Sequence, residues 1–394
     1  KTTFDFLISP AAASQTVSRD IDFISGSRVI DALTVEITTK TPNILLPRYV
    51  SGVHIVAPKH FLKAGLEGFA QDPIGTGPFK VETWGVEKAM LAANRTSWRA
   101  PVLDKVEMVA LPDGTTRMQA MASKRVDIAT NINPDDIAAL EAVGNRFHRR
   151  NPTRVLVLAL DNIREGSPFK DVRVRQALNY AINRKAIIDT LLGGVVEPAS
   201  QPAVPVAVGY VPGLKPYDYD PAKAKALLAE AGYAKGLSFL VELPGGQLAN
   251  DTAITQQIAA DLSAVGVRMD IRIITFPQLV KNMTVGGWKG FGLMTDFASA
   301  PALDMMRAFN RHSCRWAAPW YCDPAIQTTI DDAETSFDLN ERMALTQKAV
   351  QHYRDTAANV LLYPAVSLDG ISAKVTHWQP WNDNFMYHTA DIQN

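Results

Sequence analysis

Two cysteines in the last third of the chain are the first residues whose type and spacing suggest chemistry. Cys314 and Cys322 are the only cysteines and lie close together in RHSCRWAAPWYCDP. Sparing use of cysteine with one close pair favours an oxidising compartment and a local disulfide. A metal site made from His312 and both thiols is an alternative, although a closely spaced third ligand and a fourth are missing. Two free thiols are the remaining interpretation.

Sequence motifs for catalysis are missing from the chain. It contains no GxSxG, HExxH, SxxK followed by KTG, or Walker pattern. The glycines of Ile74-Gly75-Thr76-Gly77 precede Pro78 rather than a GK[ST] ending, which favours a tight turn over a phosphate cradle. The histidines lie far apart, so a triad assembled in space has no support from the sequence. We therefore predict that the protein is not an enzyme and needs no cofactor.

Aromatic residues are frequent around the cysteine pair. Ligand sites are usually mostly apolar with a few placed polar groups, so the RWAAPWY loop is a candidate pocket wall. Core packing explains any single one of these aromatic residues as well. The candidates are Trp288, Phe297, Trp316, Trp320 and Tyr321, with Arg315 among them.

Length and charge limit the class of protein. A chain of 394 residues exceeds the size of most single cores, which favours two lobes. Lys plus Arg and Asp plus Glu both number 40, and no long run of like charge occurs, so nucleic acid is not an expected partner. The longest apolar stretches have the length of a strand rather than of a membrane span.

The elements that would position these residues follow from periodicity and helix signals. The apolar run Val155 to Leu160 predicts a strand buried on both faces. Alternating runs predict further strands at 33–39, 105–111 and 267–274. Residues 238–243 and the apolar run 359–363 are also predicted as strands. Helical spacing and caps predict helices at 171–192, 221–231, 253–265 and 340–356. Helices that alternate with strands after residue 160 indicate an α/β lobe.

Five stretches of the sequence occur in a distinctive order along the chain. They are PIGTGPFKVETW at 73–84, ANRTSW at 93–98, LDKVEMVALPDGTTRMQAMASKRVDIA at 103–129, FKDVRVRQALNYAINRKAIID at 169–189 and YDPAKAKALLAEAGY at 219–233. Together they resemble the bacterial extracellular solute-binding proteins of family 5, which include peptide and nickel-complex receptors. Weaker similarity continues to the C-terminus. Members of the family normally carry roughly a hundred further residues ahead of this point, so the sequence resembles a truncated member.

The resemblance implies an α/β, two-lobed periplasmic binding protein fold of class II-like type, with mixed sheets, flanking helices and a hinge. Residues 1–157 with 365–394 would form the first lobe, and residues 158–364 the second. Ligand that touches both lobes would favour the closed state over the open one. Trp381 and Phe385 would then face the aromatic loop from the first lobe, although core packing explains them too.

The resemblance also implies a role for one carboxylate. Peptide-binding members carry an acidic residue in a W-x-A-D-Y-x-D-P-like segment that receives the ligand's ammonium group. Here the segment reads GLMTDFAS, so Asp296 takes that position, between Thr295 and Phe297. Leu293, Ser299 and Ala300 depart from the pattern, which leaves other amine-bearing ligands open beside peptides. A turn-forming or capping aspartate is the alternative.

We therefore expect the substrate-binding component of an ABC importer, in the periplasm or anchored outside a Gram-positive membrane. Its expected partners are a membrane permease and a small-molecule ligand. We expect this ligand to be a short peptide or another amino-group-bearing compound, with a metal chelate, a sugar oligomer or an aromatic nutrient as the alternatives. We expect a monomer. A periplasmic hydrolase on a two-lobed scaffold and a sensory binding subunit are the alternatives.

Overall fold

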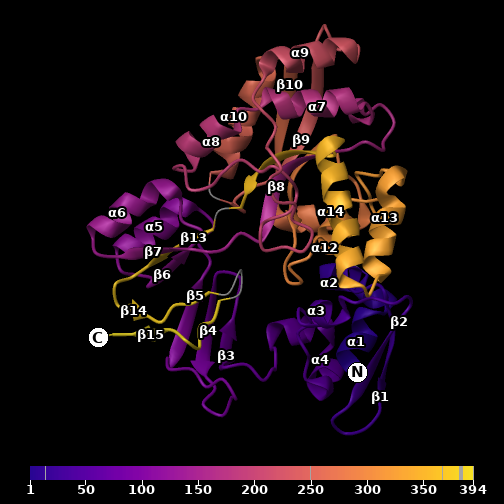
Figure 1. The fold of residues 1–394 in the computed structure, drawn as a ribbon. Coiled ribbons are helices and arrows are strands. Elements are labelled where there is room, and N and C mark those ends of the chain that lie inside the picture. Colours follow the sequence, from indigo (N-terminus) through magenta and orange to yellow (C-terminus); the bar gives the residue numbers. More distant parts are fainter. Residues whose placement is uncertain (14, 249, 366, 381–384, 394) are drawn as a thin grey trace.

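The protein forms several sheets and helices arranged around one central mixed sheet (Figure 1). The structure is a computed structural model that describes residues 1–13, 15–248, 250–365, 367–380 and 385–393. In the view of Figure 1, the middle of the chain lies at the top, residues 324–355 lie at the right, and both termini lie below. No helix among the described residues is long and apolar enough to cross a bilayer.

The central sheet has the strand order β10-β9-β11-β8-β12. β9, β10 and β11 are parallel, while β8 runs antiparallel to its neighbours β11 and β12. The strands are β8 (Arg154–Leu160), β9 (Leu237–Pro244), β10 (Val267–Ile274), β11 (Gly292–Ala298) and β12 (Asn359–Pro364). All residues of β8 after Arg154 are buried, which confirms the strand predicted from the apolar run and its burial on both faces.

Helices cover both faces of this sheet because each face presents a continuous apolar surface. Leu156, Leu158 and Leu160 of β8 pack into one core, and the alternate residues Val155 and Val157 pack into a second core. The first face is covered by α7 (Val172–Ala181), α8 (Arg184–Leu191), α9 (Pro221–Glu230) and α10 (Asp251–Ser263). The second is covered by α12 (Met305–Arg311), α13 (Pro324–Thr335) and α14 (Leu339–Asp355), with α11 (Phe276–Val285) beside them.

The single helix predicted over 171–192 is wrong, because the chain breaks into α7 and α8. Ile182 between them has an extended backbone. The side chain of Asn183 accepts a hydrogen bond from the amide of Ala186 and so begins a new helix. The buried guanidinium of Arg184 donates to the carbonyls of Asn179 and Leu361, which fixes the bend against β12.

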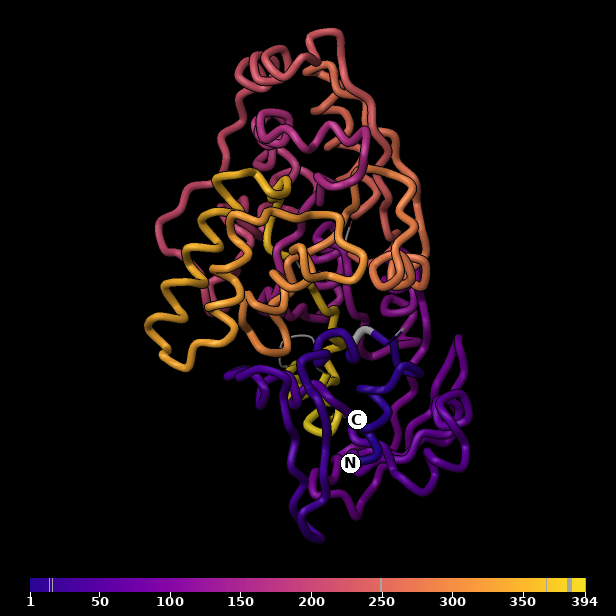
Figure 2. Tube along the Cα trace, turned by 90° about the vertical axis from the view of Figure 1, so that its right-hand side faces the viewer, coloured from indigo at the N-terminus to yellow at the C-terminus, as the bar shows by residue number. Residues whose placement is uncertain are grey.

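The remaining elements lie below the central sheet. The first part of the chain holds α1 (Thr2–Leu7), α2 (Thr16–Asp20), α3 (Leu46–Val50), α4 (Pro58–Gln71) and the hairpin β1 (Ile24–Val29) with β2 (Val35–Thr39). A meander follows, made of β3 (Phe79–Trp84), β4 (Lys88–Ala93) and β5 (Lys105–Val109). Figure 2 shows the C-terminal segment passing down from the upper part of the molecule into this lower part.

The C-terminal segment enters a small sheet made by residues far away in sequence. Its strand β13 (Leu368–Ile371) lies between β6 (Ile128–Thr130) and β7 (Arg146–Arg149), and α5 (Gly114–Ala122) and α6 (Ile137–Ala142) adjoin them. β14 (Val375–Thr376) then pairs with β15 (Asp391–Ile392). Strands β8 and β12 therefore lead directly from the central sheet into this second region.

The N-terminal segment packs on the second half of the chain. Its buried residues Phe4, Ile24 and Tyr49 share one core with α12 and α13. Asp20 also accepts hydrogen bonds from Arg307 and Arg311, at 2.9 and 3.1 Å. The division into a lobe of residues 1–157 with 365–394 and a lobe of residues 158–364 stays a prediction.

Candidate ligand-binding site

A pocket lies at the edge of the central sheet where strands β9, β11 and β12 end and β8 begins. Open α/β sheets bind ligands outside the carboxyl ends of their strands, so this edge is a physically favoured place for a site. The pocket has a volume of about 100 Å³. Its polar groups come from Arg154, Gln247, Asp251, Thr295 and Asp296, and its apolar wall is formed by Leu156, Leu243, Pro244, Leu248, Ile254, Phe276, Leu279, Met294 and Tyr363.

Asp296 and Arg154 form an ion pair inside this pocket. Both side chains lie on the same face of the sheet, and the guanidinium Nη1 donates to the carboxylate Oδ2 at 3.2 Å. The side chains of Arg154 and Asp296 keep 30% and 23% of their exposure. The pair is therefore accessible from the pocket rather than sealed in the core, and a ligand group can reach both charges.

A second carboxylate in the pocket is already occupied by its own loop. Asp251 begins α10, and its Oδ2 accepts hydrogen bonds from the amides of Gln247 and Leu248 at 3.0 and 3.4 Å. Its Oδ1 accepts from the hydroxyl of Thr252 at 3.2 Å. Asp251 thus shapes the loop after β9, while Asp296 is the carboxylate better placed to meet a ligand.

Phe297, the next residue along β11, lies on the opposite face of the sheet. Its ring is 1% exposed and stacks on the imidazole of His312 with centroids 3.9 Å apart. The Nε2 of His312 lies 3.0 Å from the carbonyl oxygen of Asp296, which suits a neutral imidazole donating from Nε2. Burial lowers the pKa of His312 to about 4. Phe297 therefore packs under the site rather than in the pocket.

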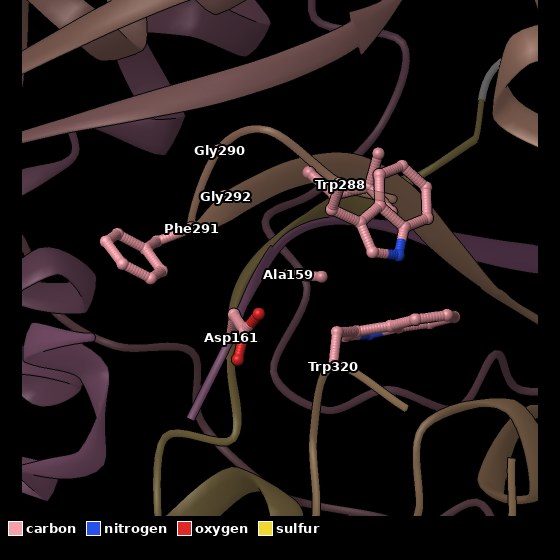
Figure 3. A pocket seen from close by; sticks show the side chains of 8 residues that line it. Ala159, Asp161, Trp288, Gly290, Phe291, Gly292 and Trp320 are labelled. Atoms are coloured by element: carbon pink, nitrogen blue, oxygen red, sulfur yellow. The ribbon is translucent and has the colours of Figure 1, made fainter. Parts of the chain in front are cut away.

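The tryptophans of the aromatic loop also belong to this opposite core. Trp316, Trp320 and Tyr321 are buried there, and the indole of Trp316 donates to the carbonyl of Met283 at 2.6 Å. Trp288 and Trp320 meet edge to face, with centroids 6.1 Å apart. Figure 3 shows both rings beside Asp161 at a cavity of only about 10 Å³, roughly the size of one water molecule.

The loop that carries these aromatic residues is held by covalent and polar contacts. Cys314 and Cys322 form a disulfide, so both thiols are used. The side chain of Asn162 accepts from the amide of Cys322 at 2.9 Å and donates to its carbonyl at 3.0 Å. Arg315 forms ion pairs with Asp331 and Glu334 of α13. These contacts hold Arg315 and the loop in place at a distance from Asp296.

The predicted first-lobe aromatics lie elsewhere. Phe385 stacks on Trp378 with centroids 5.6 Å apart, and the guanidinium of Arg150 lies 5.0 Å from its ring centroid. Phe385 and Trp378 belong to a small core formed largely by the C-terminal segment. Trp381 lies outside the described residues. Of the predicted site residues that the structure describes, only Asp296 and Thr295 line the edge pocket.

Sequence reasoning missed Arg154, Phe276, Leu279 and Tyr363. Arg154 directly precedes the apolar run predicted as a strand, so a charged residue at the strand's beginning was a usable signal. A larger cavity, of about 440 Å³, lies between β5, β6 and the C-terminal segment. This larger cavity does not lie at the carboxyl ends of the strands of the central sheet. The edge pocket is therefore the stronger candidate for a ligand site.

The structure has a central mixed sheet with helices on both faces, and strands β8 and β12 lead from this sheet into a second region. A pocket lies at the ends of these two strands. Together these features define a class of protein. This class is the two-lobed periplasmic binding proteins. The description "Bacterial extracellular solute-binding proteins, family 5 Middle" matches residues 1–311, and the chain belongs to this family. The resemblance drawn from the five sequence stretches is thereby confirmed.

Solved structures show the same two-lobed fold. A periplasmic binding protein, DppA from Helicobacter pylori in complex with the peptide STSA, superposes with a TM-score of 0.87 at 21% identity, covering 100% of this chain and 81% of that chain. The binding protein AgaA from A. tumefaciens R10, in complex with agropinic acid, gives a TM-score of 0.86 at 22% identity, with 100% and 82% covered.

The matches with curated relatives cover a smaller share of each relative's length. The Di/tripeptide-binding protein 2 of Pseudomonas aeruginosa is 28% identical over 295 residues, which are 72% of this chain and 54% of that protein. A glutathione-binding protein of Salmonella typhimurium is 33% identical over 347 residues, which are 83% of this chain and 66% of that protein. The chain thus spans about half the length of the first of these relatives, and both relatives are named as binding proteins.

Proposed function

We propose that this protein captures a small solute outside the cytoplasm and delivers it to the membrane permease of an ABC importer. Membership of the solute-binding family supports the role of capture and delivery. The observation that carries the proposal is an accessible carboxylate, Asp296, in a largely apolar pocket at the carboxyl edge of the central sheet. The proposed ligand is a short peptide or another compound with an amino group, and the proposed state is a monomer.

Ligand capture follows from the two connections between the regions. β8 begins and β12 ends at the pocket, so a bend of these two strands changes what faces it. We assign residues 1–157 with 365–394 and residues 158–364 to the two lobes that close. A ligand held by Asp296 on one side and by the other lobe on the opposite side stabilises closure because it contacts both.

Charge is the physical reason for an amine ligand. A carboxylate forms strong charge-assisted hydrogen bonds with an ammonium group, and such a charge can be enclosed only when it is paired. Names of related proteins are consistent with ligands of this kind, since they include a di/tripeptide-binding and a glutathione-binding protein. A hydrolase is not favoured, because these relatives are named for binding.

A thermal-shift screen tests the proposal. The probes are the dipeptide Met-Leu, glutathione, a nickel–histidine complex and a neutral oligosaccharide. A ligand at 100 times its Kd should stabilise the protein by about 2.7 kcal/mol. Asp296→Asn should abolish stabilisation by an amine ligand, while Asp270→Asn on the exposed side of β10 serves as the matched control. Stabilisation by the oligosaccharide alone, unchanged in Asp296→Asn, would remove the amine assignment.

A measurement of ligand uptake by the host cells distinguishes a role in transport from a role in sensing. Deletion of the gene should abolish accumulation of the radiolabelled ligand if the protein serves an importer. A sensory subunit would leave accumulation intact and change only the response to the ligand. Chromatography with light scattering, with and without ligand, tests the proposed monomer.

A further inference from the structure

We infer that Arg154 and Asp296 together receive a ligand group that carries an ammonium and a carboxylate on the same carbon. The group is the zwitterionic end of an α-amino acid, with an apolar side chain. This inference rests on the proposed function and makes its ligand class narrower. Its basis is the spacing and exposure of the ion pair and the composition of the wall around it.

The ion pair has bonding capacity left for a ligand. A guanidinium carries five N–H donors and a carboxylate accepts at both oxygens. Within the described part of the chain, one donor of Arg154 and one oxygen of Asp296 are joined, through Nη1 and Oδ2 at 3.2 Å. Both side chains remain partly exposed. A ligand ammonium can therefore contact Asp296 while a ligand carboxylate contacts Arg154, without either partner leaving the pocket.

The distance between the two protein charges selects the distance between the ligand charges. In an α-amino acid the ammonium nitrogen and the carboxylate carbon are separated by two bonds, or about 2.5 Å. One more residue in an extended dipeptide moves the carboxylate about 3.5 Å further away. Charges in contact on the protein thus match the charges of one amino acid, whereas a dipeptide can engage only one member of the pair.

The balance of charges in the pocket also favours a zwitterionic ligand. The walls around the pair are mainly apolar, from Leu156, Leu243, Phe276, Leu279 and Tyr363. A ligand with a single charge would draw one member of the pair away and leave the other without a partner once closure of the lobes excludes water from the pocket, which is costly. A zwitterion pairs both charges at once. It leaves no group unpaired when the pocket closes.

The apolar wall accounts for the side chain of the ligand. An engineered apolar cavity of about 150 Å³ is large enough for benzene. The edge pocket, at about 100 Å³, is therefore suited to a side chain such as that of leucine or valine. Phe276 and Leu279 of α11 and Tyr363 of β12 line this pocket and would contact it.

Titration calorimetry with four probes tests the inference. L-leucine carries both charges, L-leucinamide only the ammonium, N-acetyl-L-leucine only the carboxylate, and Leu-Leu carries both charges at a greater separation. L-leucine should bind about tenfold or more tightly than each of the other three, because one charged hydrogen bond more is worth about that factor.

Two variants assign the two halves of the zwitterion. Asp296→Asn should weaken L-leucine at least tenfold and abolish the binding of leucinamide. Arg154→Gln should weaken L-leucine by a similar factor, leave leucinamide unchanged and abolish N-acetyl-leucine. Thermal melts verify that both variants fold. Arg154→Lys, which keeps the charge, should restore part of the affinity.

Other results overturn the inference in ways that leave the proposed function distinguishable. Binding of Leu-Leu or leucinamide as tight as that of L-leucine, with Arg154→Gln unaffected, would show that Asp296 acts alone on a peptide-like ligand. The role in solute capture would then stand. Failure of all four probes also overturns the zwitterion site, while the broader screen described above decides the proposed function separately.

Discussion

The two faces of strand β11 have very different surroundings, although the residues on them are neighbours in sequence. Asp296 faces the edge pocket with its ion-paired carboxylate partly exposed, whereas Phe297 is enclosed in the core beneath it. The alternation of side chains along a strand produces this contrast within a single peptide step. It separates a face that can meet a ligand from a face that supports the fold.

The supporting face is built to keep the pocket face in position. His312 stacks on Phe297 and contacts the backbone carbonyl of Asp296 at 3.0 Å. The hydroxyl of Tyr353 donates to the carbonyl of His312 at 2.5 Å. The backbone of Asp296 is therefore anchored from below, and its side chain is the part left for recognition. Changes on the two faces should have opposite consequences for stability and binding.

Loss of the buried ring should have the largest effect on stability. Phe297→Ala removes a side chain that is 1% exposed, and such truncations cost about 3–5 kcal/mol. Urea unfolding measures the change. The matched control is Phe276→Ala, which removes the same ring from the pocket side, where it is 52% exposed. That variant should lose ligand affinity with little loss of stability, and equal stability losses would contradict the contrast between the faces.

Low pH should destabilise the folded protein because His312 is buried on the supporting face. Burial lowers the pKa of His312 to about 4, so the unfolded chain binds a proton between pH 6.5 and 4 that the folded protein does not. Stability should therefore fall as pH drops through this window, by about 1.4 kcal/mol per pH unit and about 3 kcal/mol in total.

Unfolding curves at several pH values check this dependence. His312→Gln should flatten the slope between pH 6.5 and 4. An identical slope in His312→Gln would assign the acid sensitivity to other groups.

The disulfide should contribute the next largest amount. Cys314 and Cys322 are separated by 8 in sequence, and closing a loop of that size stabilises by about 2.5 kcal/mol in the chain-entropy account. Replacing both cysteines by serine should lower stability by that amount, measured by urea unfolding. Dithiothreitol should have the same effect on the original protein and none on the double variant. Ligand affinity should change little, because the loop lies on the supporting face.

Sequence alone predicted much of the scaffold but only part of the site. The strand at β8 followed from one uninterrupted apolar run, and its local signal needed no partner. The bend at Ile182 was missed because a buried contact of Arg184 with Leu361, far away in sequence, fixes it. Arg154 was missed for a similar reason: it meets Asp296 across 142 positions of sequence. The pairing register of β8 with β11 decides that contact, and no local pattern encodes it.

The grouping of Asp296 with Phe297 and the tryptophans shows a second limit. Segment 292–298 mixes glycine, threonine and aspartate with apolar residues, so it was not recognised as a strand. Had it been, the period of two would have separated Asp296 from Phe297 at once. Prediction of the site thus depended on knowing which element carried it.

The smallest effect expected on stability is that of the ion pair itself. Exposed and half-exposed pairs contribute about 0–1 kcal/mol, so Asp296→Asn and Arg154→Gln should each leave urea unfolding nearly unchanged. A double-mutant cycle measures their coupling directly. A coupling of several kcal/mol would mean that the pair belongs to the scaffold and not to the recognition surface. A coupling below about 1 kcal/mol, beside a large loss of ligand affinity, would mean that the two charges are retained for the ligand.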